Sequence, residues 1–263
     1  MRILICFKVI RDLEYITPGE LLALAGGRLD MSVFQQVIGS YDEAALETAL
    51  RLADDLREQK DDVILHALTV GSCESRFAKN LYALGFDEVF CLATEQDISW
   101  KPEFTAGCIA AFVRGGGGYD LILTGKQAGP GENAMTPRLL AHELDLPCLP
   151  EVIEMIPHKK GIAVKCKTDT GSCSLILISP VVCAVGEAAH LYLRVATLRE
   201  KLATASKELR VLPAAVFPPE RAAEFLCYIY EEQEKQCRFI EGADLKQKVH
   251  TLWTEYLGQW VQP

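Results

Sequence analysis

DLILTGKQAGPGENAMTPRLLAHELDLP, which spans Asp120 to Pro147, is the stretch of the chain that decides the fold. It opens on a short apolar run, Leu121–Thr124, which has the length of a strand and ends at a glycine. The next residues form a loop with three glycines, where the backbone can take positive φ and approach a ligand closely. These glycines are Gly125, Gly129 and Gly131.

A helix start follows this loop. Thr136 is a good N-cap residue and Pro137 is a good first helical residue, and leucines continue the pattern. A strand, a glycine loop and a helix start together point backbone N–H groups and the positive helix end at one place, where an anion is stabilised. Neither G-x-G-x-x-G nor the Walker lysine pattern occurs, so these residues alone also fit an ordinary β–α turn.

The composition favours a soluble globular protein without a basic surface. The chain has 263 residues, of which 49% are hydrophobic and 24% charged, and a formal net charge of −9. This charge argues against a general nucleic-acid binder and against binding to an anionic membrane surface. No apolar run reaches transmembrane length, and Met1 leads directly into strand-like sequence. We therefore expect a cytoplasmic protein without stable membrane insertion.

The ten cysteines indicate buried reduced thiols more than a metal or redox site. No Cys-x-x-Cys occurs and no cysteine–histidine pair has zinc-finger spacing, so no metal site is expected. Most of these cysteines have apolar neighbours, among which a thiol behaves as a small hydrophobic group. Cys166 and Cys173 are the pair that could face each other across a hairpin.

Upstream of Asp120, strands and helices alternate. Apolar runs at Arg2–Phe7, Val63–Val70 and Glu88–Leu92 predict strands. Helices are predicted from Ser40 to about Leu56, over Glu74–Leu84 and over Pro102–Arg114, the first with Ser40 and Glu43 as a capping box. This order predicts a doubly wound, mostly parallel α/β sheet with a Rossmann-like layout, similar to that of adenine-nucleotide hydrolases.

Downstream of Pro147 we expect a small antiparallel extension over Glu151–Ile156, Gly161–Thr168 and Cys173–Ile178. Pro180–Val185 is expected to return to the main sheet. We therefore predict an α/β domain over residues 1–185 and, over residues 186–263, an extended arm with C-terminal helices that pack on a partner subunit. Those helices are expected at Glu220–Gln236 and Ala243–Leu257, the latter with an apolar face.

Several segments together resemble the beta subunit of electron-transfer flavoproteins. They are the opening strand Arg2–Lys8, the helix start Tyr41–Leu52 and, most specifically, the Gly-Lys-Gln-Ala motif Gly125–Ala128 in its strand–loop–helix context. The final helix is also similar. The resemblance covers nearly the whole chain and is strongest over residues 1–150.

This resemblance implies an electron-carrier subunit that performs no covalent chemistry of its own and forms a heterodimer with an alpha subunit. In the family, alpha holds most of the redox FAD, and beta supports that FAD and binds AMP or, in electron-bifurcating members, a second FAD. No catalytic residues are expected. Open α/β sheets place their ligands at the carboxyl ends of the strands. The cofactor-binding positions implied by the resemblance and by this strand-end rule are Cys6, Lys8, Gly39, Ser40, Tyr41, Asp42, Val70, Gly125, Lys126, Gln127, Ala128, Gly129, Gly131, Glu132, Asn133 and Thr136.

Partner docking is implied for a second segment. Ala196-Thr197-Leu198 resembles the leucine-bearing loop through which the family docks flavin dehydrogenases, so Leu198 is the expected docking residue. Two other functions remain open on the residues alone: a stress-type protein that binds adenine nucleotides, and a nucleotide hydrolase of similar fold.

The chain departs from the family pattern after the motif. Gly129–Met135 stands where the family has Ile-Asp-Gly-Asp-Thr-Gly-Gln, and Pro130 brings no backbone N–H. Asn133, Thr136 and Lys126 still offer donors to a phosphate. The sequence leaves open whether the beta site takes AMP or FAD.

Overall fold

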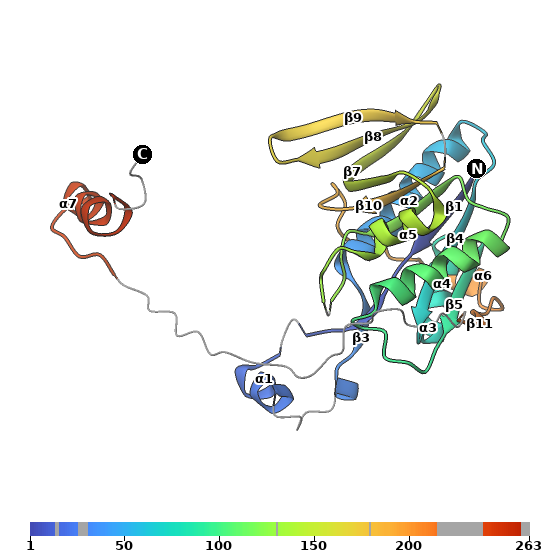
Figure 1. Ribbon diagram of the computed structural model, residues 1–263, viewed down its shortest axis with the longest axis horizontal. Helices are drawn as coiled ribbons and strands as arrows, with labels where there is room; N and C mark the ends of the chain where they lie inside the picture. Colours follow the sequence, from blue (N-terminus) through green and yellow to red (C-terminus); the bar gives the residue numbers. More distant parts are fainter. Residues whose placement is uncertain (14–15, 26–30, 130, 179, 215–238, 259–263) are drawn as a thin grey trace.

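The computed structural model describes residues 1–13, 16–25, 31–129, 131–178, 180–214 and 239–258 (Figure 1). The strands are β1 (Arg2–Cys6), β2 (Val9–Arg11), β3 (Gln36–Ile38), β4 (Ile64–Gly71), β5 (Glu88–Ala93), β6 (Leu121–Gly125), β7 (Cys148–His158), β8 (Gly161–Thr168), β9 (Gly171–Leu177), β10 (Val181–Val185) and β11 (Arg210–Pro213). The helices are α1 (Pro18–Ala25), α2 (Ser40–Glu58), α3 (Ser75–Ala83), α4 (Pro102–Gly115), α5 (Thr136–Leu144), α6 (Leu198–Ala203) and α7 (Leu245–Thr251), with a short 3-10 turn, η1 (Met31–Val33), and a π-helical turn, η2 (Leu252–Leu257).

One nine-stranded sheet runs in the order β11-β5-β4-β1-β6-β10-β7-β8-β9. The strands from β11 to β7 pair in parallel, and β8 is antiparallel to both of its neighbours. The predicted α/β class is therefore confirmed. Parallel strands place all their carboxyl ends at one edge of the sheet, which is where open α/β sheets bind ligands.

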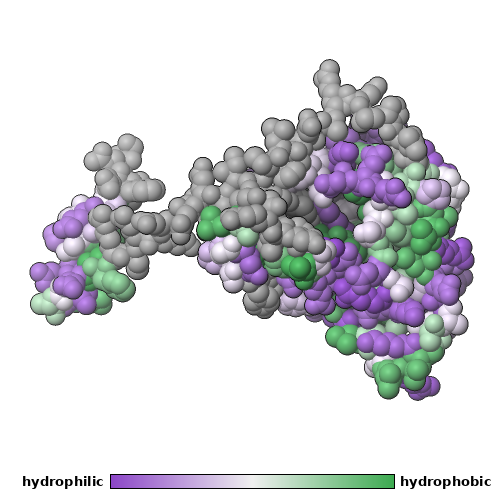
Figure 2. All heavy atoms as spheres, turned by 90° about the horizontal axis from the view of Figure 1, so that it is seen from below, coloured by the Kyte–Doolittle hydropathy of each residue, from purple (hydrophilic) through white to green (hydrophobic). Residues whose placement is uncertain are grey.

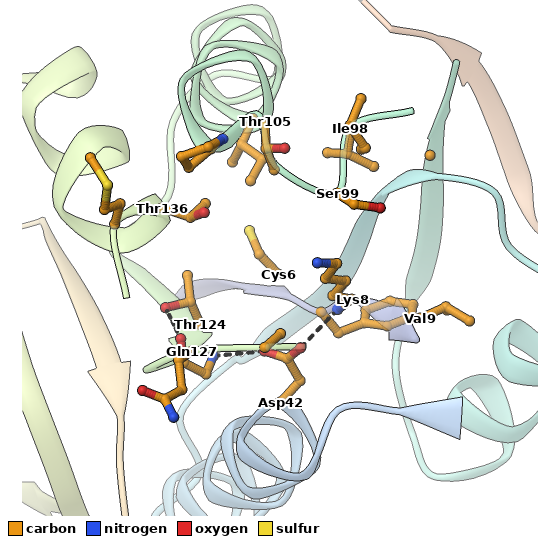
Figure 3. Close-up of a pocket in the computed structure, with 18 of the residues that line it drawn as sticks. Cys6, Lys8, Val9, Asp42, Ile98, Ser99, Thr105, Thr124, Gln127 and Thr136 are labelled. Atoms are coloured by element: carbon orange, nitrogen blue, oxygen red, sulfur yellow. Dashed lines mark hydrogen bonds between the residues drawn. The ribbon is translucent and has the colours of Figure 1, made fainter. Parts of the chain in front are cut away.

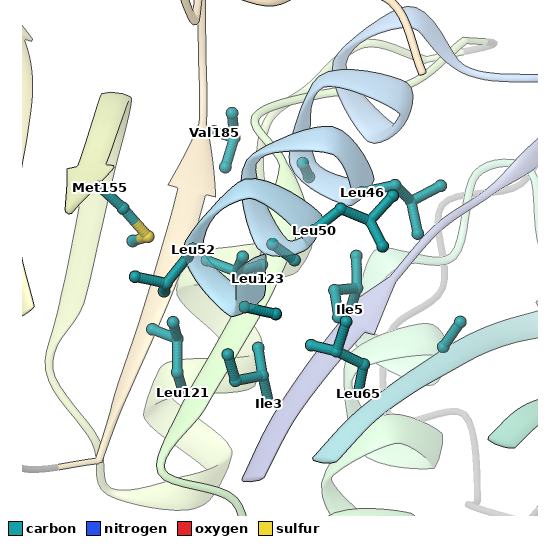
Figure 4. Close-up of a cluster of buried hydrophobic side chains, with 14 of the residues drawn as sticks. Ile3, Ile5, Leu46, Leu50, Leu52, Leu65, Leu121, Leu123, Met155 and Val185 are labelled. Atoms are coloured by element: carbon teal, nitrogen blue, oxygen red, sulfur yellow. The ribbon is translucent and has the colours of Figure 1, made fainter. Parts of the chain in front are cut away.

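Helices cover both faces of the sheet. On one face α2 packs over the central strands, and its Leu46, Leu50 and Leu52 are enclosed with Ile3 and Leu121 (Figure 4). On the other face α4 and α5 lie side by side and close a second buried cluster. Complete burial of one such leucine side chain stabilises the fold by about 1.5–3 kcal/mol.

The expected capping box at the start of α2 is wrong. Gly39 occupies the N-cap position, Ser40 is the first helical residue, and no side chain caps this end. The reason lies with Glu43, whose carboxylate accepts a hydrogen bond from the backbone of Leu193 instead of turning back to the cap. A distant segment therefore takes the acceptor on which the local motif depends.

The predicted antiparallel extension is present, but it belongs to the main sheet. The strand β10 inserts between β6 and β7 and pairs in parallel with both. The hairpin β8–β9 then continues the sheet to its edge (Figure 1).

The segment after residue 185 also returns to the sheet. Prediction placed residues 186–263 outside the α/β body, yet β11 pairs in parallel with β5 along Arg210–Pro213. The helix α6 packs beside α3 on the way. The chain up to Pro213 is therefore part of the body, and the expected extended arm does not begin at residue 186.

The C-terminal helix lies where the sequence placed it, as α7 and η2. None of its residues is buried, and exposed apolar side chains include Leu245, Val249 and Trp253. The predicted helix Glu220–Gln236 lies outside the described residues. Of the helices in the described ranges, none combines the length and the apolar character needed to cross a membrane.

Candidate functional site

A cavity of about 530 Å³ opens at the carboxyl ends of the parallel strands (Figure 3). Its walls come from the ends of β1 and β4, the loop after β5, the start of α4, and the loop between β6 and α5. This size is within the range of small-molecule sites, about 300–1,000 Å³. Thr105, Ser99 and Thr136 surround the opening, and Cys6 lies at its floor.

A single carboxyl group fastens two of these strand ends together. Asp42, in the first turn of α2, is only 5% exposed. Its Oδ2 accepts the backbone N–H of Lys8 at 2.9 Å, and its Oδ1 accepts that of Gly125 at 2.9 Å (Figure 3). The ends of β1 and β6 are thus held at a fixed separation by one side chain, and both border the cavity.

Gly125 is required by this contact and not by its backbone angle. A Cβ atom at this position would lie 2.5 Å from Asp42 Oδ1 and 2.8 Å from Asp42 N. The prediction that the loop glycines permit positive φ holds for Gly131, whose φ is +103° and which lies against the ring of Trp100. Gly125 and Gly131 therefore serve different physical needs.

The charge of Asp42 is only partly compensated. Burial raises the pKa of Asp42 to about 7, against the two N–H bonds and the nearby Lys8, which favour the ionised form. Burial also lowers the pKa of Lys8, although Asp42 and Asp97 oppose that shift. A carboxyl group that titrates near neutrality therefore lies next to a lysine at the cavity wall.

The loop between β6 and α5 is shaped by strained residues. Glu132 and Ala134 have positive φ, 38° and 53°, which non-glycine residues adopt rarely. Asn133 Oδ1 accepts the backbone N–H of Met135 at 3.1 Å. The expected Thr136 cap is displaced by one residue: Met135 is the N-cap and Thr136 begins the helix. Thr136 still lines the cavity.

Lys126 is shared between the cavity and a neighbouring ion pair. Its Nζ lies 3.2 Å from Glu151 Oε1 and 4.9 Å from the ring centre of Tyr41. Glu151 itself has a positive φ of 52°, and it packs against Gly186, where a Cβ would approach its carboxylate to 2.4 Å. The side chain of Lys126 is therefore oriented by the strand that follows α5.

The structure brings most of the predicted site residues to one cavity. Those that line it are Cys6, Lys8, Asp42, Val70, Gly125, Lys126, Gln127, Ala128, Asn133 and Thr136. Those that do not line it are Gly39, Ser40, Tyr41, Gly129, Gly131 and Glu132. Gly39 lies directly behind it, since a Cβ there would be 3.2 Å from Asp42 Oδ2.

Sequence reasoning missed one wall of the cavity. The segment Thr94–Ser99 and the α4 residues Pro102, Thr105 and Ile109 face the opening. No motif marks them, but they directly follow a predicted parallel strand, and the strand-end rule alone could have included them. They add two carboxylates, Glu95 and Asp97, to the lining.

Leu198 lies in a separate region, on the segment that leads to β11. Its side chain is 73% exposed, at the start of α6. Thr197 and Glu200 form a complete capping box there. Further exposed apolar side chains on this segment are Leu191, Tyr192, Val195 and Leu202. We call residues 191–202 the apolar segment.

The apolar segment is fixed to α2 by ion pairs. The guanidinium of Arg194 donates to both carboxylate oxygens of Glu47, at 3.0–3.1 Å, and to Asp54 at 2.7 Å. Glu47 is 1% exposed and also pairs with Arg51 at 2.8 Å. Ala196, two residues further on, is also buried. The exposed side chains are therefore presented from an anchored backbone.

Within the described residues, no group of three or more histidine, cysteine or acidic side chains is placed to hold a metal ion. The view in Figure 2 shows a mixed surface, on which hydrophilic side chains separate smaller hydrophobic areas.

Comparison with known proteins identifies similar chains. The family model of the electron transfer flavoprotein domain matches residues 33–216. A putative electron transfer flavoprotein subunit of Escherichia coli (strain K12), YgcR, is 32% identical over 267 residues, which cover 100% of both chains.

Two further relatives match over roughly half of their length. The electron transfer flavoprotein subunit beta of Bacillus subtilis (strain 168) is 25% identical over 137 residues, 52% of this chain and 51% of that protein. Subunit CarD of the caffeyl-CoA reductase-Etf complex of Acetobacterium woodii is 27% identical over 164 residues, 62% of this chain and 60% of that protein.

Proposed function

Because this chain belongs to the electron transfer flavoprotein family, we propose that it is the beta-type subunit of a two-subunit electron carrier. The observation that carries the proposal is the position of the Gly125–Ala128 motif. All four residues of this motif line the cavity, next to the strand ends tied by Asp42. In this role the chain supports an FAD held mainly by an alpha subunit.

The cavity suits the adenine-nucleotide part of a cofactor. Val70, Ile98 and Ile109 offer apolar surface for a ring system. Lys8 and the N-terminal turn of α5, with Thr136, offer positive charge and N–H donors for a phosphate. Glu95 and Asp97 can accept hydrogen bonds from ribose hydroxyl groups or an amino group. We propose that AMP or the adenylate part of a second FAD binds here.

The apolar segment is the proposed docking surface for a flavin dehydrogenase. Leu198 and Val195 are highly exposed, while the adjacent Arg194 is paired with Glu47 and Ala196 is buried. A rigid apolar surface loses little conformational entropy when a partner covers it. This arrangement supports the docking role proposed for Leu198.

The C-terminal helix is the proposed contact with the alpha subunit. Exposed apolar residues recur along α7 and η2, at Leu245, Val249, Leu252, Trp253 and Leu257. The described residues of the chain leave these apolar side chains exposed. An exposed apolar helix face of this kind is typical of a surface that another protein covers. We propose that the partner subunit supplies the surface that covers it.

Co-expression tests the proposal. The chain is produced alone and together with an alpha-type subunit from the same genome, and each product is purified by size exclusion. The expected result is a yellow one-to-one complex, with poor solubility and no yellow colour for the chain alone. Nucleotide extracted from the complex distinguishes AMP from a second FAD.

The same experiment addresses the alternative functions. A stress-type nucleotide-binding protein or a nucleotide hydrolase of similar fold would purify alone as a stable homodimer, and a hydrolase would consume ATP. Either result would contradict the subunit proposal. A Leu198→Ser variant that still forms the yellow complex would keep the subunit role. Docking of the dehydrogenase can then be tested separately on that complex.

A further inference from the structure

Two cysteines face each other on the outermost hairpin of the sheet. In the antiparallel pairing of β8 with β9, Cys166 lies directly opposite Cys173. Directly opposed residues of antiparallel strands point to the same side of the sheet, with Cα atoms about 4.5–5.5 Å apart. Disulfides span Cα separations of about 4.4–6.8 Å. The backbone therefore already holds the two residues at a distance that a disulfide can bridge.

The two thiols differ in their surroundings. Cys166 is 4% exposed and faces the core, whereas Cys173 is exposed. Burial raises the pKa of Cys166, and so do the proximity of Cys173 and the hydrogen bond between the two thiols. Cys166 thus keeps its proton and donates it toward the sulfur of Cys173. The sulfur of Cys173 is accessible to reagents in solution, and the sulfur of Cys166 lies next to it.

The other cysteines in the described strands lie opposite residues of other types. Cys91 lies opposite Thr69 in the sheet, and Cys183 lies opposite Leu123 and Leu149. All cysteines in the described residues are reduced. Direct strand-to-strand opposition of two cysteines is, among these residues, confined to β8 and β9.

We propose that Cys166 and Cys173 are a reversible oxidation site, at which a low-molecular-weight disulfide converts the two thiols into a cross-strand disulfide. In the first step the Cys173 thiolate attacks one sulfur of the reagent, forms a mixed disulfide and releases one thiolate. In the second step the Cys166 sulfur attacks Cys173 Sγ, loses its proton and expels the second thiolate. The protein loses two electrons and two protons, and the reagent is reduced to two thiols.

The position of the pair indicates what oxidation does. β9 is the edge strand of the nine-stranded sheet, and its sequence from Gly171 to Leu177 carries no charged residue. An uncharged edge strand is free to separate or to pair wrongly. A covalent bond to β8 holds β9 in register. This inference does not depend on the proposed electron-carrier role.

Oxidation of the full-length chain, in its purified complex where it forms one, tests the inference. The protein is equilibrated with glutathione disulfide and glutathione at increasing ratios, quenched with acid, alkylated and mapped by mass spectrometry of peptides. The expected product is a peptide pair joined between Cys166 and Cys173, which reduced glutathione converts back to thiols. Amide hydrogen exchange in β8 and β9 is expected to slow in the oxidised protein.

Single variants identify the two roles. Cys173→Ser removes an exposed sulfur and is expected to abolish the product without unfolding the protein. Cys166→Ser is expected to leave a mixed glutathione disulfide on Cys173. Cys148→Ser, which removes a half-buried thiol of β7, is the matched control and should oxidise like the natural chain.

Three results would overturn the inference. One is the absence of the Cys166–Cys173 link at the most oxidising ratio. Another is a link from Cys173 to a different cysteine, such as Cys227 or Cys237. The third is a mixed disulfide that persists on Cys173 in the natural chain, because Cys166 would then not act as the resolving thiol.

Discussion

The helix α2 carries two buried carboxyl groups that anchor two different parts of the molecule. Asp42, in its first turn, accepts backbone N–H groups from the ends of β1 and β6. Glu47, just over one turn later, accepts the guanidinium of Arg194 and that of Arg51. The first anchor holds the cavity, and the second holds the apolar segment. They differ mainly in the donor: backbone N–H groups bond to Asp42, whereas charged guanidinium groups bond to Glu47.

This difference separates a responsive region from a fixed one. Burial outweighs the two N–H donors and the nearby charge of Lys8, so the pKa of Asp42 rises to about 7. Its charge therefore depends on pH and on whatever enters the cavity. Arg194 remains charged at any physiological pH, so the second anchor is constant. The cavity end of α2 is suited to respond to a ligand, and the other end is suited to present a rigid surface.

Removal of the first anchor should have the largest effect. Asp42→Ala leaves the N–H groups of Lys8 and Gly125 without their acceptor. Each unsatisfied buried group costs about 1–3 kcal/mol, so we expect about 2–6 kcal/mol of lost stability. Thermal unfolding of the purified protein should show a Tm lower by about 4 °C or more.

The matched control is Asp55→Ala, which removes an exposed carboxylate from the same helix. Its stability should change by no more than about 0.5 kcal/mol. Equal losses in the two variants would show that Asp42 has no special role in tying the strands, and the comparison between the anchors would fail.

The pH dependence of stability should also distinguish the two anchors. The pKa of Asp42 rises from 3.8 to about 7 on folding, so its contribution is complete below pH 3.8 and is lost as the pH rises through about 7. Asp42→Asn cannot titrate. The stability of the natural chain relative to this variant should therefore fall between about pH 4 and about pH 8, by less than the loss in Asp42→Ala. Urea unfolding at several pH values measures the free energy of unfolding of the natural chain relative to Asp42→Asn. A relative stability that rises with pH would contradict the prediction.

A methyl group at Gly125 should disturb the first anchor by steric overlap. The added Cβ of Gly125→Ala would lie 2.5 Å from Asp42 Oδ1 and 2.8 Å from backbone atoms, so the strand end must move. Overpacking of this kind costs about 1–3 kcal/mol. In Gly129→Ala the nearest atom would be 4.0 Å away, at Glu132. Only Gly125→Ala should be less stable in urea unfolding. Only that variant should also carry less bound nucleotide when it is purified in the complex.

Loss of the second anchor should be felt in the apolar segment. Arg194→Met removes charged hydrogen bonds from Glu47 and Asp54, although Arg51 still pairs with Glu47. We expect a loss of about 1–3 kcal/mol, with faster amide exchange over residues 191–202. Arg199→Met, on the exposed side of α6, is the control. Unchanged exchange in the Arg194 variant would show that the segment is held by other contacts.

The sequence predicted the frame of the molecule better than its two anchors. Apolar runs of strand length identified β1, β4, β5, β6 and β10, and the predicted Gly125–Ala128 motif lines the cavity. These features are local, because strand length, helix periodicity and turn residues are decided within a few positions. The α/β class and the parallel sheet follow from their order.

The anchors were missed because their partners are far apart in the chain. Glu43 and Ser40 have the spacing of a capping box, yet Glu43 bonds to Leu193 and leaves the cap to Gly39. The strand β11 is short, exposed and partly charged, so no apolar pattern indicated its return to the sheet. Pairings between residues 40–54 and 193–194, or between β5 and β11, have no signal in a single sequence.

The smallest effect on stability is expected where the functional effect on docking is largest. Leu198→Ser removes a side chain that is 73% exposed, so the folded chain loses almost no burial and its Tm should stay within about 2 °C. Arg194 still holds the backbone, and the rest of the apolar segment stays in place.

If the segment docks a flavin dehydrogenase, electron transfer from that partner to the complex should slow, while reduction of the bound flavin by dithionite stays unchanged. Slower transfer in Leu198→Ser at unchanged stability would confirm that a side chain presented by the second anchor takes part in docking. Equal transfer rates would leave the anchor as a purely structural tie between α2 and the chain that leads to β11.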